Sequence, residues 1–331
     1  LARNLVLCQC RTLPVDSLVF RALRRLWKSA EMRQDAELFG VLSMRFEITP
    51  ARLFIASAQS SIFLQQKRRY VRFRNAVQQE ENQLCFSNLT RDYFRRRAWR
   101  TLRRLAMMEP KAYPAMATGI LLAARDKDAP KPFVSRHPYW DADTRRYNTH
   151  ERHHSPYSRW LVFSQILFRE DPSVCWSSSG LSWWRQQPEA QLAFELQPRT
   201  EAFADLWNAQ PACLMQCLTQ ADIPEVKRFA ARALADLPEF LAALSVAEWE
   251  IVLQQGEHGL ALAWHYFKPL LEAGTTPANC AVWFLRAVYA PATDFLLNWI
   301  TAHPAVIQQV PEIPLYLALH PDARCQHLLA L

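Results

Sequence analysis

Apolar residues recur at helical spacing along most of the chain, and prolines separate one run from the next. In residues 91–106 the apolar positions fall at i, i+4, i+8 and i+11, which is the spacing of one buried helix face. That face consists of Phe94, Ala98, Leu102 and Leu105. The helices predicted in the first part of the chain cover residues 15–28, 30–46, 51–66, 91–106 and 114–124. These patterns predict an N-terminal helical domain over residues 1–125.

Two stretches depart from this periodicity. Residues 126–156 contain four prolines among aspartates, histidines and arginines, and residues 171–198 are rich in serine and tryptophan. Neither stretch shows a helical apolar period. We therefore expect an irregular connection over residues 126–198, which holds one short helix at residues 157–168.

From residue 199 onward, short apolar helices alternate with turns that proline or glycine marks. The segment EVKRFAARALADL places Ala230 and Ala233 on its apolar face, where small side chains let a neighbouring helix approach closely. Residues 201–303 resemble HEAT-like helical repeats, and we expect such repeats over residues 199–331. The whole chain is predicted to be all-α, a helical bundle followed by an irregular HEAT-like α-solenoid with a concave binding face.

Two further segments carry a resemblance of their own. TRDYFRRRAWRTLRRLA and PYSRWLVFSQILF resemble parts of bacterial HEAT-type proteins that carry a tryptophan–glycine–arginine (WGR) domain. That domain is linked with nucleic-acid binding, and the resemblance implies the same class of partner here. The sequence itself shows no WGR domain, so the expectation of nucleic-acid binding depends on the arginines.

Basic residues concentrate in one region of the chain. Residues 67–104 carry twelve Lys and Arg against three Asp and Glu, a net charge of +9, whereas the whole chain carries +8. The positive charge is therefore a local patch, whose natural counterpart is a polyanion or an acidic partner. Trp99 lies among these arginines, where it can pack inward or stack on a base. The candidate nucleic-acid contacts are Lys67, Arg68, Arg69, Arg72, Arg74, Arg95, Arg96, Trp99, Arg100, Arg103 and Arg104.

Three interpretations of this patch are open at this point. The guanidinium groups can pair with carboxylates elsewhere in the fold, contact nucleic-acid phosphates without reading sequence, or dock an acidic protein. The run RRYVRFR alternates in a way that would place Tyr70, Arg72 and Arg74 on one side of a strand. The run is too short to distinguish a strand from a helix.

The chain shows no catalytic motif, and we expect a non-enzymatic protein without a cofactor. Its six glycines form neither a phosphate loop nor a dinucleotide fingerprint. The serines at 177–179 lack the flanking glycines of a nucleophile elbow. We therefore favour a binding scaffold over a hydrolase.

Histidines and acids gather between residues 137 and 154 and supply ligand types for a transition metal. They are His137, Asp141, Asp143, His150, Glu151, His153 and His154. Their spacing matches no known ligand scheme, and we favour a polar, partly solvated loop over a metal site. A metal-dependent nuclease, with Asp141 or Asp143 as ligand or base, is the enzymatic alternative.

Composition sets the remaining expectations. Half of the 331 residues are apolar, which is enough for a sizeable core. The eight cysteines form no C-x-x-C pair, which favours a reduced, cytoplasmic protein in which Cys213 and Cys217 pack as small apolar residues. No run of eighteen apolar residues occurs, so we expect no membrane span. The chain begins at Leu1 without a secretion signal, a pattern consistent with a fragment or a processed product.

Overall fold

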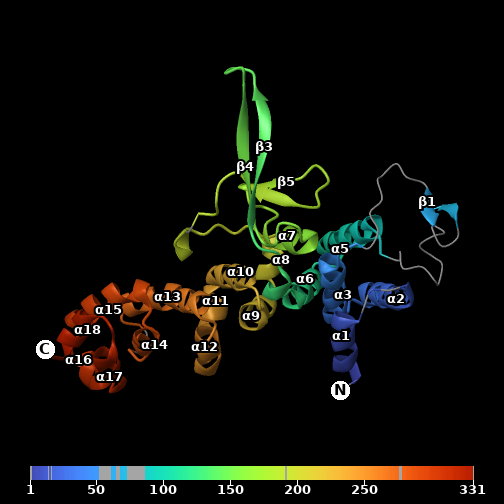
Figure 1. Cartoon of the computed structure of the whole chain (residues 1–331). Coiled ribbons are helices and arrows are strands. Elements are labelled where there is room, and N and C mark those ends of the chain that lie inside the picture. Colours follow the sequence, from blue (N-terminus) through green and yellow to red (C-terminus); the bar gives the residue numbers. More distant parts are fainter. Residues whose placement is uncertain are drawn as a thin grey trace. The chain divides into compact units, whose positions relative to one another are not determined.

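The protein is mostly helical and also contains antiparallel β-structure (Figure 1). The computed structural model describes residues 2–13, 15, 17–51, 61–64, 68–72, 86–190, 192–275 and 278–330. Contacts divide the chain into two compact units, one formed by Leu1–Leu192 with Pro198–Phe229 and the other by Ala193–Gln197 with Ala230–Leu331. The expectation of a mainly helical chain is confirmed, but the all-α class is wrong because two sheets are present.

The first unit contains helices that range from five to 21 residues. They are α1 (Ala2–Thr12), α2 (Ser17–Arg33), α3 (Ala36–Ile48), α5 (Asn88–Met108), α6 (Ala112–Ala123), α7 (Leu161–Leu167), α8 (Ala204–Asn208) and α9 (Pro211–Gln220). The helices predicted over residues 91–106 and 114–124 correspond to α5 and α6. The break between α2 and α3 lies at Gln34, which has φ 54°, and not near residue 29. Asp35 sets this boundary because its side chain accepts a hydrogen bond from the Leu38 amide at 3.1 Å and caps α3.

Residues 51–66 do not form the predicted helix throughout. Ser61–Leu64 is strand β1, which pairs antiparallel with β2 (Arg69–Arg72). This pairing decides between strand and helix for the run that contains Tyr70 and Arg72. Residues 52–60 and 65–66 of the predicted helix lie outside the described residues.

The core of the first unit is a cluster of aromatic rings. Phe94 of α5 lies 5.2 Å from Trp27 of α2 and 4.7 Å from Phe46 of α3, measured between ring centroids. All four residues of the predicted stripe on α5 are buried, as the apolar period required. The indole N–H of Trp27 donates to Ser43 Oγ at 2.9 Å, so the polar atom of this buried ring is satisfied.

Two glycines let α3 and α6 cross closely. A Cβ atom on Gly40 would lie 2.0 Å from the backbone oxygen of Gly119, and one on Gly119 would lie 2.0 Å from that of Ala36. Both obstacles are backbone atoms, which cannot rotate away. The crossing therefore requires glycine at both positions.

The segment expected to be an irregular connection forms a four-stranded antiparallel sheet. Its strands are β3 (Phe133–Asp141), β4 (Arg146–His154), β5 (Val174–Trp176) and β6 (Trp183–Arg185), in the order β3-β4-β6-β5. β4 pairs with β6 only at His153↔Arg185, so β3 and β4 continue past the short strands as a two-stranded ribbon (Figure 1). Most side chains of this ribbon are exposed or half-exposed on both faces. Without a buried face, the sequence lacks the apolar alternation that identifies a strand.

The second unit is built from helices that range from five to 16 residues. They are the end of α10 (Pro224–Ala235), α11 (Pro238–Ala242), α12 (Val246–Leu253), α13 (Glu257–Glu272), α14 (Cys280–Arg286), α15 (Ala290–Ala302), α16 (Ala305–Gln309), α17 (Glu312–Leu319) and α18 (Ala323–His327). Ala230 and Ala233 of α10 are fully buried, as their place on the apolar face predicted. Several helices contact the next one in the chain, and α14 also contacts α17. Within the described residues, no helix is long and apolar enough to cross a membrane.

Candidate nucleic-acid interface

Helix α5 carries the seven arginines that dominate the charge of the chain, and it divides them into two sets. The helix begins after Ser87, whose side chain accepts a hydrogen bond from the Thr90 amide at 3.1 Å. Arg91, Arg95 and Arg97 lie on sides of the helix that face other elements, where they are buried or half-buried. The other four arginines are exposed. Position on the helix therefore decides which arginines can meet a partner.

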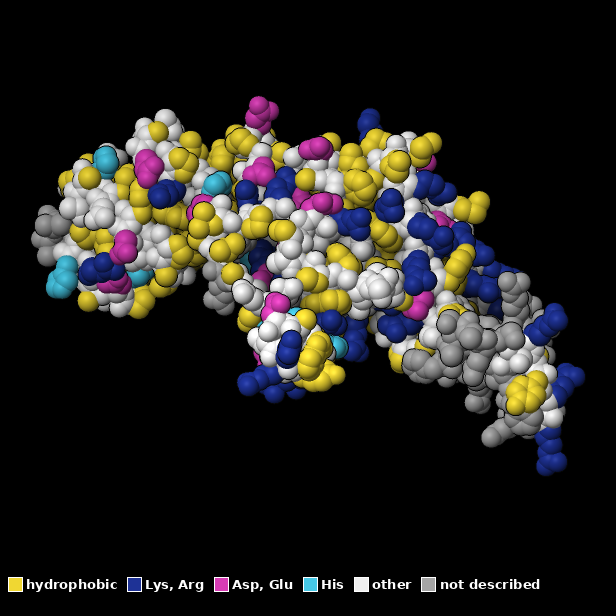
Figure 2. Space-filling model, turned by 90° about the horizontal axis from the view of Figure 1, so that it is seen from above, with side chains coloured by type: hydrophobic (Ala, Val, Ile, Leu, Met, Phe, Trp, Pro, Cys, Tyr) yellow, Lys and Arg dark blue, Asp and Glu magenta, His cyan; other side chains and the backbone are white. Residues whose placement is uncertain are grey.

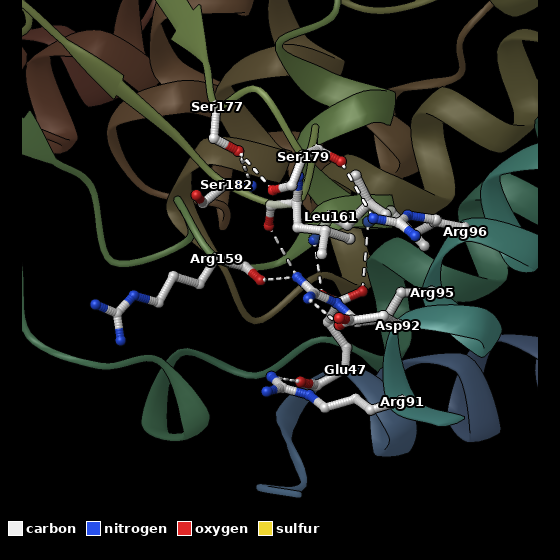
Figure 3. Close-up of polar contacts among 12 residues, drawn as sticks. Glu47, Arg91, Asp92, Arg95, Arg96, Arg159, Leu161, Ser177, Ser179 and Ser182 are labelled. Atoms are coloured by element: carbon white, nitrogen blue, oxygen red, sulfur yellow. Dashed lines mark hydrogen bonds and ion pairs between the residues drawn. The ribbon is translucent and has the colours of Figure 1, made fainter. Parts of the chain in front are cut away.

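Arg95 is a structural residue at the centre of a buried polar network (Figure 3). Its Nε donates to Glu47 Oε1 at 2.5 Å, and its Nη2 donates to the backbone oxygens of Arg159 and Leu181. Glu47 in turn accepts from the backbone amide of Leu161 at 2.7 Å, at the start of α7. The Arg95 side chain is only 6% exposed. A guanidinium enclosed in this way is not available to a phosphate.

Two further arginines stabilise the fold through hydrogen bonds to other helices. Arg91 Nη2 donates to the backbone oxygen of Glu47 at 2.6 Å. Arg97 Nη2 donates to Glu31 Oε2 at 2.5 Å, and the Arg97 guanidinium also lies 5.4 Å from the centre of a Trp27 ring. The Glu31 carboxylate is buried and accepts a second hydrogen bond from the Thr101 hydroxyl. Carboxylate pairing, the first of the three interpretations, holds for Arg95 and Arg97.

The exposed set occupies one face of α5. Arg96, Arg100, Arg103 and Arg104 fall at i, i+4, i+7 and i+8, which is one side of a helix. None of them forms an ion pair within the described residues, and the one hydrogen bond recorded there is from Arg96 Nη2 to the backbone oxygen of Ser179 at 3.4 Å (Figure 3). Figure 2 shows Lys and Arg side chains gathered over the part of the first unit that contains α5. We call these four residues the arginine face.

The remaining predicted contacts do not join the arginine face. Trp99 is 9% exposed and packs inward, with its ring 6.4 Å from that of Phe203, so it offers no stacking surface. Arg68, Arg69 and Arg72 are exposed in the separate β1–β2 hairpin. Lys67 and Arg74 lie outside the described residues.

The histidines between residues 137 and 154 lie along the ribbon and contact its other side chains. The Ser135 hydroxyl lies 3.1 Å from His137 Nε2 and 2.8 Å from His154 Nε2, and His150 stacks on Tyr139 with 3.9 Å between ring centroids. Burial lowers the pKa of His154. Among the described residues, no three His, Cys, Asp or Glu side chains converge as a metal site.

Asp141, one of the acids considered for a nuclease, lies at the turn of the ribbon. Its side chain accepts hydrogen bonds from the backbone amide of Asp143 at 3.0 Å and from Asn148 Nδ2 at 2.8 Å. These contacts hold the turn in place. The hydrogen-bonding capacity of Asp141 is thus used within the ribbon.

The sequence interpretation missed the exposed end of the ribbon. There Trp140 and Tyr147 pair across the strands, and Arg145 and Arg146 flank them. The available signal was the symmetry of YWDADTRRY, in which aromatic residues stand on both sides of a short polar turn. That pattern is typical of a hairpin, but the prolines and histidines around it obscured it.

Comparisons with known proteins add no family to this description. No family model, no curated protein and no solved structure matches the chain.

Proposed function

We propose that this protein is a non-enzymatic binding scaffold whose arginine face engages a polyanion, with nucleic acid as the favoured partner. One observation carries the proposal, namely that four exposed arginines on one helix face form no ion pair with a carboxylate within the described residues. Neighbouring like charges repel one another, and an anion bound between them offsets this repulsion. Phosphates along a nucleic-acid backbone supply such anions at regular intervals.

The rigid support of α5 also favours binding. Arg95 and Arg97 tie the helix to α3 and α2 through two buried carboxylates, so the exposed arginines project from a fixed element. Contacts of this kind go to phosphates and carry no sequence information. We therefore propose binding without sequence preference.

We further propose that the second unit is a HEAT-like repeat module of the kind that accompanies WGR domains. Its consecutive short helices, which contact their neighbours in the chain, support this assignment. A concave surface of such repeats would add contacts with a protein partner.

The test is binding of labelled DNA and RNA across a salt series, with the full chain and with Arg96→Ala, Arg100→Ala and Arg103→Ala combined. Each lost phosphate contact reduces the slope of log affinity against log salt by about 0.7 to 0.9, so the triple variant should lose about 2 to 3 units of slope. Lysine at the same three positions should keep most of that slope, because the charge remains. Arg286→Ala, which removes an exposed arginine from the second unit, is the control for net charge.

An acidic protein is the second candidate partner, because the same arginine face fits carboxylates. If nucleic acid does not bind at low salt, the proposal of a nucleic-acid scaffold fails. Salt-sensitive capture of acidic proteins from nuclease-treated lysate, lost in the triple alanine variant, would then support the second candidate.

A further inference from the structure

The β3–β4 ribbon ends in an exposed pair of aromatic rings. Trp140 on β3 and Tyr147 on β4 are cross-strand partners, with ring centroids 5.2 Å apart and ring planes at 68°. Trp140 is 54% exposed and Tyr147 is 75% exposed. In an edge-to-face pair, the ring that contributes its edge keeps both of its faces clear of its partner. The end of the ribbon therefore presents an aromatic surface to solvent.

Two exposed arginines lie beside these rings. Arg145 and Arg146 lie at the end of the turn, are exposed, and form no ion pair within the described residues. Two of the acids in the ribbon are already engaged, since Asp141 accepts hydrogen bonds in the turn and Glu151 pairs with Arg136 at 3.0 Å. Asp141 and Asp143 balance the two arginines in net charge, but neither pairs with them within the described residues, so both guanidinium groups remain available to a phosphate.

The turn holds Arg145 in an unusual backbone conformation. Its φ is 48°, in the left-handed region that disfavours every residue with a Cβ atom and suits glycine. Arginine stands there in spite of this local conformational cost. Gln34, Arg68, Phe203 and Val288 share this conformation, so at Arg145 it reflects the geometry of the hairpin turn.

The small sheet links the ribbon to the arginine face within the first unit. Arg96 donates to the backbone oxygen of Ser179, in the turn between β5 and β6, and β6 pairs with β4 at His153↔Arg185. This connection joins α5 to the base of the ribbon, and the Trp140–Tyr147 pair lies at the opposite end (Figure 1). The first unit therefore contains a second surface, of two aromatic rings and two exposed arginines, besides the arginine face.

We propose that the end of the ribbon binds unpaired nucleotides. A base stacks on Trp140 or Tyr147, and its phosphate is held by Arg145 and Arg146. Stacking on a protein ring needs an uncovered base, and bases inside a duplex are covered on both faces by their neighbours, so the ribbon prefers single strands. This inference rests on the proposed function, to which it adds the class of nucleic acid.

The experiment measures the affinity of the full chain for labelled oligothymidylate and for its duplex with oligoadenylate, at one salt concentration. Trp140→Ala and Tyr147→Ala should each weaken binding of the single strand about tenfold, with little change for the duplex. Tyr147→Phe keeps the ring and is the matched control, with unchanged affinity expected.

Arg145→Gly separates binding from ribbon stability. Glycine relaxes the left-handed backbone and should slow amide hydrogen exchange in β3 and β4, while loss of the charge should weaken single-strand binding. If Arg145→Gly and the two alanine variants all leave single-strand affinity unchanged, the ribbon proposal is overturned.

The triple variant of the arginine face, measured in parallel, distinguishes the two proposals. Loss of affinity in that variant together with unchanged affinity in the ribbon variants would reject the ribbon alone. The reverse pattern would reject the arginine face and support the ribbon. If the unaltered chain binds neither oligonucleotide, both proposals fail.

Discussion

The Glu47 carboxylate and the Arg95 guanidinium lie 2.5 Å apart in the interior of the first unit, where both side chains are almost fully buried. The pair joins α3 to α5, and its further hydrogen bonds reach the start of α7 and the backbone at Leu181. A buried charge that loses its counterpart keeps its desolvation cost. The pair therefore fixes how three helices of the first unit pack.

Glu47→Gln should destabilise the protein by about 3 kcal/mol, because it leaves the buried charge of Arg95 paired only with the more exposed Asp92. Urea unfolding measures the change. Arg100→Ala, on the exposed side of the same helix, should change the free energy of unfolding by less than about 0.5 kcal/mol. Equal effects of the two substitutions would contradict the structural role of the pair.

Gly119→Ala should destabilise the protein by about 3 kcal/mol or prevent folding, since the new methyl group would meet the backbone oxygen of Ala36 at 2.0 Å. Thermal unfolding gives the measurement. Gly180→Ala is a suitable comparison, because no atom lies within 4 Å of its added Cβ, although φ is 69°. That variant should lose only about 1 kcal/mol through backbone strain. A mild effect at Gly119 would show that α3 and α6 can separate at little cost.

Asp171 should make stability depend on pH in the acid range. Burial alone would raise the pKa of Asp171, but hydrogen bonds from Ser173 and Arg185 and the charge of Arg185 outweigh it and lower the pKa below 3.8. The folded state therefore binds the proton less readily than the unfolded state, and the stabilisation from Asp171 is lost as pH falls below about 4.

Asp171→Asn tests this dependence, with Arg185 and Glu189 left in place. The difference in the free energy of unfolding between the unaltered chain and this variant should be constant near neutral pH and shrink below about pH 4. Urea unfolding of both proteins at several pH values measures this difference. A difference that does not change with pH would mean that the carboxylate contributes no more than a neutral amide.

Cys217 should resist alkylation until the first unit unfolds. Its side chain is buried beside the Thr118 hydroxyl, and burial raises the pKa of its thiol to about 12, so almost no thiolate exists at neutral pH. The exposed thiol of Cys8 should react at once. Mass spectrometry after brief treatment with iodoacetamide, with and without urea, distinguishes the two sites. Rapid labelling of native Cys217 would contradict the packing around α9.

The apolar period correctly predicted which side of α5 is buried, because the spacing of Phe94, Ala98, Leu102 and Leu105 depends only on helix geometry. The same period could not distinguish the arginines that pair with buried carboxylates from those that stay exposed. The carboxylates that engage Arg95 and Arg97 come from residues 48 and 66 positions away in the sequence. Local spacing contains no information about such partners.

Sequence by itself determined that the chain is mainly helical and that its positive charge is concentrated between residues 67 and 104, since both properties are local. Only the tertiary structure decided that Arg96, Arg100, Arg103 and Arg104 remain exposed and that Trp99 packs inward. It also produced the β3–β4 ribbon, whose strands pair through backbone hydrogen bonds and bury little apolar surface. Apart from the turn pattern at residues 139–147, these strands lack the apolar alternation that marks a strand with one buried face, so little in the sequence indicated their pairing.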